Sequence, residues 1–309
     1  MKKVFIDGSA GTTGLRIRER LADRRDIELL ILSEEKRKDV AARREALNSA
    51  DIAFLCLPDD AAREAVAMIE NPNTAVIDTS TAHRTASGWL YGFPELCHDR
   101  AALASAKRIA NPGCHASGFV ALVAPLVRAG LLAKDARLSA FSLTGYSGGG
   151  KKMIAEYEAE ARAEALNAPR QYALTQKHKH LPEMQAVCGL DFAPIFSPIV
   201  ADYYAGMEVT VPLFADTVKG SVADVIAVYR EAYRNGLVRF APAMGEGGLL
   251  AGNGMAGRDD MEIGVLGNDE RILLVARFDN LGKGASGAAI QNMNILLGVD
   301  EAAGLVTGE

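Results

Sequence analysis

The chain of 309 residues is long enough for about two domains, each able to bury an apolar core of its own. Hydrophobic residues make up 49% of it, charged residues 24%, and the formal net charge is −5. This acidic balance argues against a nucleic-acid partner, because phosphate binding needs a concentrated basic surface.

Four cysteines without a CxxC pair are typical of free thiols in a reducing compartment; they are Cys56, Cys97, Cys114 and Cys188. No run of residues approaches the roughly 18 apolar positions that a membrane span requires. The first residues also lack the apolar core of a secretory signal. We therefore expect a cytoplasmic protein without membrane contact.

Short apolar runs alternate with helical segments over the first third of the chain. The expected strands cover residues 3–8, 27–32, 51–57, 74–78 and 107–110, and the expected helices include 15–21 and 60–70. Strands separated by short helices are typical of βαβ units, so this part predicts a parallel sheet.

The pattern changes at about residue 135. A helix over residues 114–130, with Pro125 inside it, precedes strand-like runs at 136–143, 207–214 and 271–278 and helical stretches at 151–166, 221–235 and 284–298. Proline inside a helix can kink it. The whole chain predicts an α/β protein with a second domain of the α+β type.

Seven residues between the first strand and the first helix form a glycine-rich loop: Gly8, Ser9, Ala10, Gly11, Thr12, Thr13 and Gly14. Glycines there let backbone amides approach a pyrophosphate at the helix N-terminus, where the dipole favours an anion. The spacing is GxxGxxG rather than the usual GxGxxG, so strand-before and helix-after context carries much of the prediction. The alternative is a glycine turn that only packs the strand on the helix.

The residues after the second strand bear on the choice of nicotinamide cofactor. Proteins that bind NAD usually carry an acid there, which bonds the ribose 2′-hydroxyl. Here Ser33 comes first, and Lys36 and Arg37 follow within reach of a 2′-phosphate, so these residues predict NADP(H). Glu34 leaves NAD as an alternative, and a solvated turn with scattered charges is another.

Cys114 stands in the one reactive context among the cysteines. It follows the turn Asn111-Pro112-Gly113 and begins a helix, where the positive end of the helix dipole favours a thiolate. A thiolate can hold an acyl group as a thioester and so divide acyl transfer into two easier steps. Cys56 and Cys188 lie in apolar runs and fit buried structural cysteines instead. We therefore predict Cys114 as a nucleophile.

The segment from His178 to Glu183 offers a base for this thiol. In an extended segment His178 and His180 point the same way, so either could serve; we favour His178, because His180 lies nearer to Pro182 and the helix expected there. This pair could also bind zinc, but no third ligand is near in sequence and thiolate chemistry needs none, so we predict no metal. His115 adjoins the nucleophile, yet its side chain leaves the helix about 100° away.

Four segments resemble a known family. They are YGFPEL at 91–96, ANPGCHASG at 110–118, GYSGGGKK at 145–152 and HKHLPE at 178–183. In order and in register they are similar to the N-acetyl-gamma-glutamyl-phosphate reductases of arginine biosynthesis, more narrowly to the shorter bacterial type. The resemblance runs from Val4 to about Asn294 and so covers nearly the whole chain.

The resemblance implies a domain organisation. Residues 1–114 would form an NADP-binding Rossmann domain, and 115–282 an α+β catalytic and dimerisation domain like that of aspartate-semialdehyde and glyceraldehyde-3-phosphate dehydrogenases. Residues 283–309 would form a C-terminal helix that returns to the first domain. A homo-oligomer, either dimer or tetramer, is expected on the same ground.

The resemblance also implies residues that contact the ligands. Those near the nicotinamide are Asn280 and Gly282, and those at the substrate are Arg84, Ser147 and Lys151. Arg84 stands where longer family members carry the arginine of SADFR and would bind the substrate phosphate. His83 departs from that motif.

The expected reaction reduces N-acetyl-gamma-glutamyl phosphate with NADPH. The Cys114 thiolate displaces phosphate, hydride reduces the thioester, and a histidine manages the proton as the semialdehyde leaves. One alternative is a sister reductase for aspartyl or N-acetyl-aminoadipyl phosphate, since one methylene changes binding by only about 1–3 kcal/mol. Another is a dinucleotide sensor without turnover, which would have no use for Cys114 and the two histidines.

Overall fold

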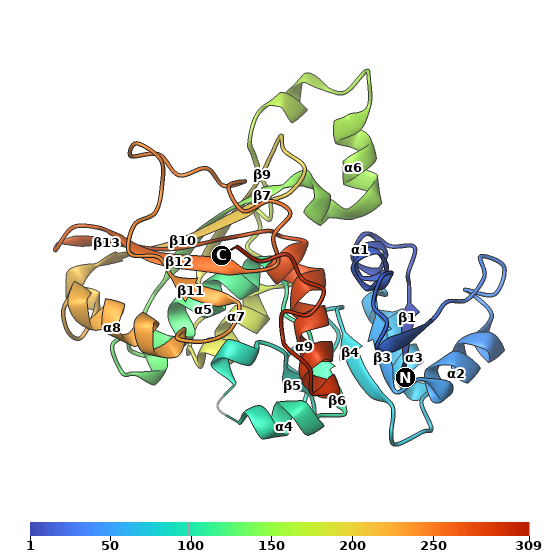
Figure 1. Cartoon of the computed structure of the whole chain (residues 1–309). Helices are drawn as coiled ribbons and strands as arrows, with labels where there is room; N and C mark the ends of the chain where they lie inside the picture. The colour runs from blue at the N-terminus through green and yellow to red at the C-terminus, as the bar shows by residue number, and fades with distance from the viewer. Residues whose placement is uncertain (98, 309) are drawn as a thin grey trace. The chain divides into compact units, whose positions relative to one another are not determined.

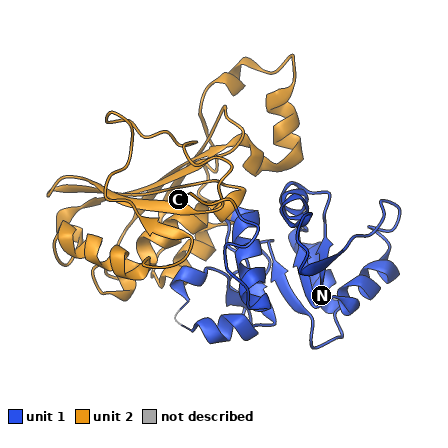
Figure 2. Ribbon diagram, viewed as in Figure 1, with its two compact units in different colours: residues 1–113, 285–305 blue, residues 114–284, 306–309 orange. Residues whose placement is uncertain are grey.

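The computed structural model describes residues 1–97 and 99–308, so Glu309 at the end of the predicted range 283–309 lies outside it. The chain divides into two compact units. Unit 1 comprises residues 1–113 and 285–305, and unit 2 comprises residues 114–284 and 306–309 (Figure 2). Figure 1 labels the helices and strands of both units.

Unit 1 is built on a six-stranded sheet in which every strand runs parallel, in the order β2-β1-β3-β4-β6-β5. The strands are β1 (Lys2–Asp7), β2 (Ile27–Leu30), β3 (Ile52–Leu55), β4 (Ala75–Asp78), β5 (Leu90–Tyr91) and β6 (Arg108–Ala110). The helices are α1 (Thr12–Leu21), α2 (Val40–Ser49), α3 (Asp59–Ala67), α4 (Arg100–Ser105) and α9 (Gly287–Leu297). The predicted α/β class is confirmed.

Two apolar cores lie on the two faces of this sheet. Val4 and Ile6 of β1 pack in a core with α1, α4 and α9, whereas Phe5 between them packs in a core with α2 and α3. Strands covered on both faces read as continuous apolar runs, which is why they were visible in the sequence. Because parallel strands end at one edge, the loops after Asp7, Leu30 and Asp78 share the edge at which such sheets bind ligands.

Unit 2 is built on a seven-stranded mixed sheet in the order β11-β12-β13-β10-β7-β9-β8. Its strands are β7 (Ser139–Gly145), β8 (Arg170–Gln171), β9 (Ile195–Ala201), β10 (Met207–Phe214), β11 (Val238–Phe240), β12 (Met261–Gly267) and β13 (Arg271–Phe278). Its helices are α5 (Cys114–Arg128), α6 (Gly150–Glu158), α7 (Leu181–Cys188) and α8 (Val222–Ala232). Short 3-10 turns lie at Pro94–Leu96 in unit 1 and at Tyr146–Gly149, Glu164–Asn167 and Ala215–Thr217 in unit 2, and a π turn covers Gly282–Ser286.

Helix α5 lies directly on the sheet of unit 2. A Cβ at Gly118 would come within 2.5 Å of Cγ2 of Val209 on β10, so only a glycine lets the helix approach this closely. Helices α5, α7 and α8 cover one face of the sheet (Figure 1), and alternate residues of β10 are buried beneath them. Among the described residues, no helix is both long and apolar enough to cross a membrane.

Pro125 lies inside α5 without ending the helix. Proline has no backbone N–H, so the carbonyl of Ala121, four residues earlier, loses its partner within the helix. The buried hydroxyl of Tyr233 donates to that carbonyl at 2.7 Å, and Tyr229 donates to the carbonyl of Leu122 at 2.6 Å. Tyr233 therefore replaces the donor that the proline removes, and Tyr229 adds a bond to the next carbonyl.

The structure of unit 2 differs from the local predictions at several places. The helix expected over 151–166 ends at Glu158, where Arg162 turns back to bond the carbonyl of Tyr157 and the carboxylate of Asp202. Strands β9 and β12 were not expected. Pro198 stands in the middle of β9, and Gly264 stands in the middle of β12, and both residues weaken a strand signal.

Candidate active site

The glycine-rich loop after β1 depends on two of its glycines. Gly8 has φ +88°, and a Cβ there would lie 2.3 Å from the carbonyl oxygen of Cys56. A Cβ at Gly14 would lie 2.4 Å from the carbonyl oxygen of Gly8. Helix α1 begins at Thr12 with Gly11 at its N-cap and no side-chain cap. The loop is thus a tight backbone cradle at an uncapped helix start, which fits a pyrophosphate.

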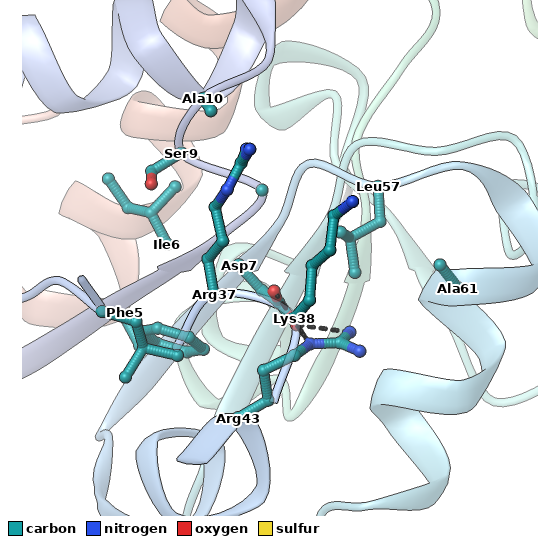
Figure 3. A pocket seen from close by; sticks show the side chains of 12 residues that line it. Phe5, Ile6, Asp7, Ser9, Ala10, Arg37, Lys38, Arg43, Leu57 and Ala61 are labelled. Atoms are coloured by element: carbon teal, nitrogen blue, oxygen red, sulfur yellow. Dashed lines mark hydrogen bonds and ion pairs between the residues drawn. The ribbon is translucent and has the colours of Figure 1, made fainter. Parts of the chain in front are cut away.

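A cavity of about 280 Å³ adjoins this loop (Figure 3). Its lining comes from β1, the glycine-rich loop, the turn after β2, α2 and the start of α3: Phe5, Ile6, Asp7, Gly8, Ser9, Ala10, Leu32, Arg37, Lys38, Arg43, Leu57 and Ala61. In Figure 3 the Arg37 guanidinium is directed toward Ser9 and Ala10. The cavity therefore combines the predicted loop with one predicted basic residue, Arg37, and with two that the sequence did not suggest, Lys38 and Arg43.

Positive charge exceeds negative charge around the cavity. Asp7 is its only acidic lining residue, and this buried carboxylate accepts from Arg43 at 2.8 Å (Nη2) and at 3.1–3.2 Å (Nε). Glu34, which does not line the cavity, is 77% exposed and pairs with Arg37 at 2.6 Å. Arg37 therefore has only this exposed carboxylate as a partner, and Lys38 has no ion-pair partner within the described residues.

Ser33 and Lys36 shape the turn rather than the cavity. The carbonyl of Ser33 accepts from the amides of Lys36 and Arg37 at 3.0 and 2.9 Å. Neither Ser33 nor Lys36 is among the lining residues. Helix α2 follows with Asp39 as its N-cap, which accepts from the amide of Ala42 at 2.7 Å, and this helix brings Arg43 to the cavity.

The loop after β4 is organised by a buried carboxylate. Asp78 is fully buried and accepts from the amide and the hydroxyl of Ser80 at 2.9 and 2.7 Å. Its Oδ2 also lies 2.6 Å from Nδ1 of His83, whose ring stacks on Trp89 with centroids 4.0 Å apart. His83 thus helps to hold the loop after β4 in place.

Arg84 ties this loop to the turn that leads to Cys114. Its Nε donates to the carbonyl of Asn111 and its Nη2 donates to the carbonyl of Thr79, each at 3.1 Å. The amide of Asn111 donates in turn to the carbonyl of Asp78 at 2.8 Å. Arg84, predicted as a phosphate ligand, therefore has at least two bonds to backbone within unit 1.

Cys114 is the first residue of α5 and is partly exposed. A Cβ at Gly284 would lie 3.0 Å from Cβ of Cys114, so the π turn passes close to the cysteine. Buried Asp279 holds this turn: its Oδ1 accepts from the amides of Leu281 and Gly282, and its carbonyl accepts from the amide of Gly284. Gly282 itself cannot carry a side chain, since a Cβ there would overlap the carbonyl of Arg258.

Three histidine rings of unit 2 lie together, one of them that of His115, the residue that follows Cys114 at the start of α5. The ring of His115 lies 5.7 Å from that of His178 and 5.5 Å from that of His180, and the latter two are 4.8 Å apart. Phe196 closes the cluster at 5.3 Å from His115. The structure thus brings together the two predicted histidines and adds His115, which the helical angle had ranked low.

His115 and His178 are held neutral by their surroundings. Burial, with the nearby charges of His178 and Lys179, lowers the pKa of His115 to about 3. Burial, with the charge of Lys179, lowers the pKa of His178 to about 4. Nδ1 of His178 accepts from the amide of His180 at 3.2 Å, so a neutral His178 carries its proton on Nε2.

The remaining predicted residues lie elsewhere in unit 2. Buried Asn280 donates to Oγ of buried Ser147 at 3.0 Å and accepts from the amide of Gly206 at 2.9 Å, so both ends of its amide join protein groups. Lys151 is exposed in the first turn of α6. Within residues 1–97 and 99–308, no group of three or more His, Cys, Asp or Glu could hold a metal ion.

The surroundings of two other cysteines do not favour a thiolate. Burial raises the pKa of Cys56 to about 12, and burial raises the pKa of Cys188 as well. Cys97 donates to the carbonyl of Asp99 at 3.2 Å. Cys114 alone among the four begins a long helix, and the next residue of that helix, His115, belongs to the histidine cluster.

Comparison with known proteins defines the class of this chain. Residues 3–104 match the NAD-binding domain of the semialdehyde dehydrogenases, and residues 114–280 match their dimerisation domain. Aspartate semialdehyde dehydrogenase from Francisella tularensis superposes with a TM-score of 0.72 at 14% identity, covering 96% of this chain and 100% of that chain. Aspartate semialdehyde dehydrogenase II from Vibrio cholerae gives 0.71 at 16% identity, covering 96% and 98%. Unit 1 therefore contains a binding domain for a nicotinamide dinucleotide.

Sequence relatives narrow the class. N-acetyl-gamma-glutamyl-phosphate reductase from Brucella anthropi is 48% identical over 307 residues, which covers 96% of this chain and 98% of the relative. The reductase of the same name from Mesorhizobium japonicum is 47% identical over 310 residues, covering 96% and 99%. The chain belongs to the family of N-acetyl-gamma-glutamyl-phosphate reductases, as its motifs predicted.

Several residues of the site could not be identified from the sequence. Tyr172 and Ser142, which both bond His115, are 57 and 27 residues away from it along the chain. Lys38 could not be singled out from its basic neighbours in the sequence. Arg43 could not be placed at the cavity, because it lies on α2, a helix that we did not expect. The N-cap Asp39 was the one local signal for that helix.

Proposed function

We propose that this protein reduces N-acetyl-gamma-glutamyl phosphate to N-acetylglutamate 5-semialdehyde and phosphate with NADPH. The observation that carries the proposal is Cys114, the first residue of α5 beside the histidine cluster, in a chain nearly half identical to reductases of this name. Unit 1 binds the cofactor, and unit 2 carries the covalent chemistry.

Cys114 acts through a thioester. Its thiolate attacks the acyl carbon, the S–C bond forms, the C–O bond to phosphate breaks, and phosphate leaves with the electron pair. When bound, the reduced nicotinamide would supply a hydride to the thioester carbon, and the oxyanion that results takes a proton from a histidine to give a hemithioacetal. The C–S bond then breaks with its electron pair returning to sulfur, and the hydroxyl proton passes to a base as the aldehyde leaves. Amides at the start of α5 stabilise the oxyanion.

The two predicted histidines divide the work between them. His178 stays neutral over the working pH range, because its pKa is about 4, and the amide of His180 occupies the lone pair of its Nδ1. A ring in this state offers Nε2–H as a donor, whereas a general base needs a free lone pair and a pKa near the working pH. We therefore assign the proton transfer to His180 and a hydrogen bond to the acyl oxygen or phosphate to His178, which reverses the preference drawn from the sequence.

The cofactor is NADPH rather than NADH. Arg37 and Lys38 line the cavity beside the glycine-rich loop, and the one carboxylate in the lining, Asp7, already accepts from Arg43. A 2′-phosphate would be stabilised by Lys38 and by Arg37, which would exchange its exposed partner Glu34 for the phosphate. Glu34, the residue that kept NAD possible, is turned to solvent.

The outer face of the unit 2 sheet supports self-association. Strand pairing places four exposed apolar side chains on the face opposite α5, α7 and α8: Phe141 (48% exposed), Ile195 (66%), Phe214 (67%) and Leu273 (38%). Such a patch on a sheet is typical of a protein interface. We assign it to a two-fold contact between copies of this chain, consistent with the dimerisation domain that residues 114–280 match.

A purified-protein assay tests the substrate. In the oxidative direction the enzyme should reduce NADP over many turnovers only when phosphate and an aldehyde are both present. N-acetylglutamate semialdehyde should give a higher kcat/KM than aspartate semialdehyde or the N-acetyl-aminoadipate homologue. A higher kcat/KM for either homologue would assign a sister reductase, and no turnover with any aldehyde would assign a dinucleotide-binding protein.

A further inference from the structure

His115 joins two hydroxyl groups inside unit 2. Its ring is 3% exposed, with Nδ1 2.6 Å from Oγ of Ser142 on β7 and Nε2 2.6 Å from Oη of Tyr172. Both ring nitrogens of this buried histidine are therefore used, and its low pKa leaves it neutral. A neutral imidazole has one N–H and one lone pair, so one hydroxyl donates to the ring and the other accepts from it.

Ser142 decides the direction of these bonds. Its side chain is fully buried, and within the described chain His115 is its only hydrogen-bond partner. A buried hydroxyl finds an acceptor for its hydrogen wherever one is within reach. Ser142 thus donates to Nδ1, the proton of His115 resides on Nε2, and Nε2–H donates to the oxygen of Tyr172.

The hydrogen of the Tyr172 hydroxyl is then left for another acceptor. Across residues 1–97 and 99–308, its oxygen has no protein partner besides His115. Tyr172 is close enough to Cys114 for the thiolate charge, together with the larger effect of burial, to raise the pKa of the phenol. It also packs edge-on against His178, with ring centroids 5.8 Å apart.

We propose that Tyr172 is a further catalytic residue, whose hydroxyl donates a hydrogen bond to the negative charge that forms at Cys114 and its acyl group. Ser142 and His115 are positioning residues that keep this hydroxyl from donating into the protein. The inference rests on the proposed covalent role of Cys114. The phenol stays protonated throughout and transfers no proton, as in other preorganised donors to an oxyanion.

The titratable groups around Tyr172 are Cys114, His115 and His178, with His180 and Lys179 next to these histidines, and Tyr146 and Tyr157 of the apolar cluster on which it packs. His115 and His178 have pKa values of about 3 and 4, so neither changes charge between pH 6 and 9. The pH profile of Cys114 reactivity is compared between the wild type and variants that all retain His180. A difference between these profiles therefore reports on the hydrogen bond from Tyr172.

Two readouts test the role of Tyr172. Tyr172→Phe should lower kcat about 100-fold with little change in KM, the effect of removing one oxyanion donor. It should also raise the midpoint pH for iodoacetamide alkylation of Cys114 by about one unit, because a donor to the thiolate is lost. Alkylation is followed on the tryptic peptide 109–128 without substrate. Tyr204→Phe, which removes an exposed phenol of the same unit, is the matched control and should change neither quantity.

Ser142→Ala tests the direction of the bonds. Without the serine hydroxyl, the proton of His115 can move to Nδ1, and Nε2 can then accept from Tyr172. Ser142→Ala should therefore lower kcat and raise the alkylation midpoint, by less than Tyr172→Phe does. In the wild type, ¹⁵N NMR of labelled imidazoles should show neutral His115 protonated at Nε2.

The proposal is overturned if Tyr172→Phe keeps kcat within twofold of the wild type with an unchanged alkylation midpoint. Protonation of His115 at Nδ1 would overturn it as well. If instead Cys114→Ser retained turnover, the covalent mechanism would fail, whatever the alkylation data showed.

Discussion

The basic residues that follow β2 differ in whether they line the cavity beside the glycine-rich loop. Arg37 and Lys38 line it, whereas Lys36 does not. Replacing Arg37 and Lys38 together with alanine should raise the KM for NADPH at least about 10-fold through loss of charge-assisted bonds, with little change in the KM for NADH. Lys36→Ala, which removes the same charge outside the lining, serves as the control. An equal rise for both cofactors, or a similar rise in Lys36→Ala, would remove the assignment to the 2′-phosphate.

His115 gives the fold a dependence on pH. Burial lowers its pKa to about 3 in the folded state, compared with about 6.5 in the unfolded chain. The full stability is therefore present above pH 6.5. As the pH falls from 6.5 toward 3, the unfolded chain binds a proton that the folded protein excludes, and the free energy of unfolding falls by up to about 1.4 kcal/mol per pH unit.

His115→Gln removes this titration and keeps a polar group for Tyr172. Its free energy of unfolding, measured with denaturant at several pH values, should fall less steeply between pH 6 and 4 than that of the wild type. A slope as steep as that of the wild type would show that other groups, such as His178, account for the acid sensitivity.

The residues of the site that could be predicted from the sequence are those whose role is evident from their neighbours in the chain. Gly8 and Gly14 follow a strand and open a helix, and Cys114 follows a Pro-Gly turn, so each could be recognised from its neighbours. Tyr172 could not, because its role comes from a contact with His115 across 57 residues. The family resemblance supplied the chemistry of the site, but it did not indicate which nitrogen atoms carry protons.

At the scale of elements, burial decided what could be predicted. The central strands β3 and β4 of unit 1 are buried on both faces and stand out as short apolar runs. Helix α2 escaped notice because only Ala46 and Leu47 of it are buried, which leaves a weak helical pattern. In unit 2, β9 was not predicted because Pro198 lies in its middle. Pro198 still takes part in the sheet, since its carbonyl accepts from the amide of Tyr172 at 3.0 Å.

Tyr233 donates to the carbonyl in α5 that Pro125 leaves without a helical partner. Tyr233→Phe should destabilise the protein by about 1–3 kcal/mol, because the carbonyl of Ala121 loses its donor in a buried place. In Pro125→Ala the amide of residue 125 can bond that carbonyl instead, so Tyr233→Phe should cost less. A double-mutant cycle of unfolding free energies measures the difference. Equal costs in both backgrounds would show that the tyrosine does not replace the missing helix bond.

At the scale of the whole molecule, the apolar outer face of unit 2 predicts an oligomer. Phe141→Asp with Ile195→Asp places two charges in the proposed contact and should shift the protein toward the monomer in analytical ultracentrifugation. Val299→Asp, at an apolar position of unit 1 with 38% exposure, is the control. If the double variant sediments like the wild type, the contact lies on another surface.

The central claim is that Cys114 carries the acyl group during catalysis. With N-acetylglutamate semialdehyde and NADP but no phosphate, the wild type should form about one NADPH per chain and gain the mass of the acyl group on peptide 109–128. Added phosphate should discharge it. Cys114→Ser should still bind NADP, yet show neither the burst nor the mass gain. Turnover of this variant above a few per cent of the wild-type rate, or an acyl group on another residue, would contradict the account.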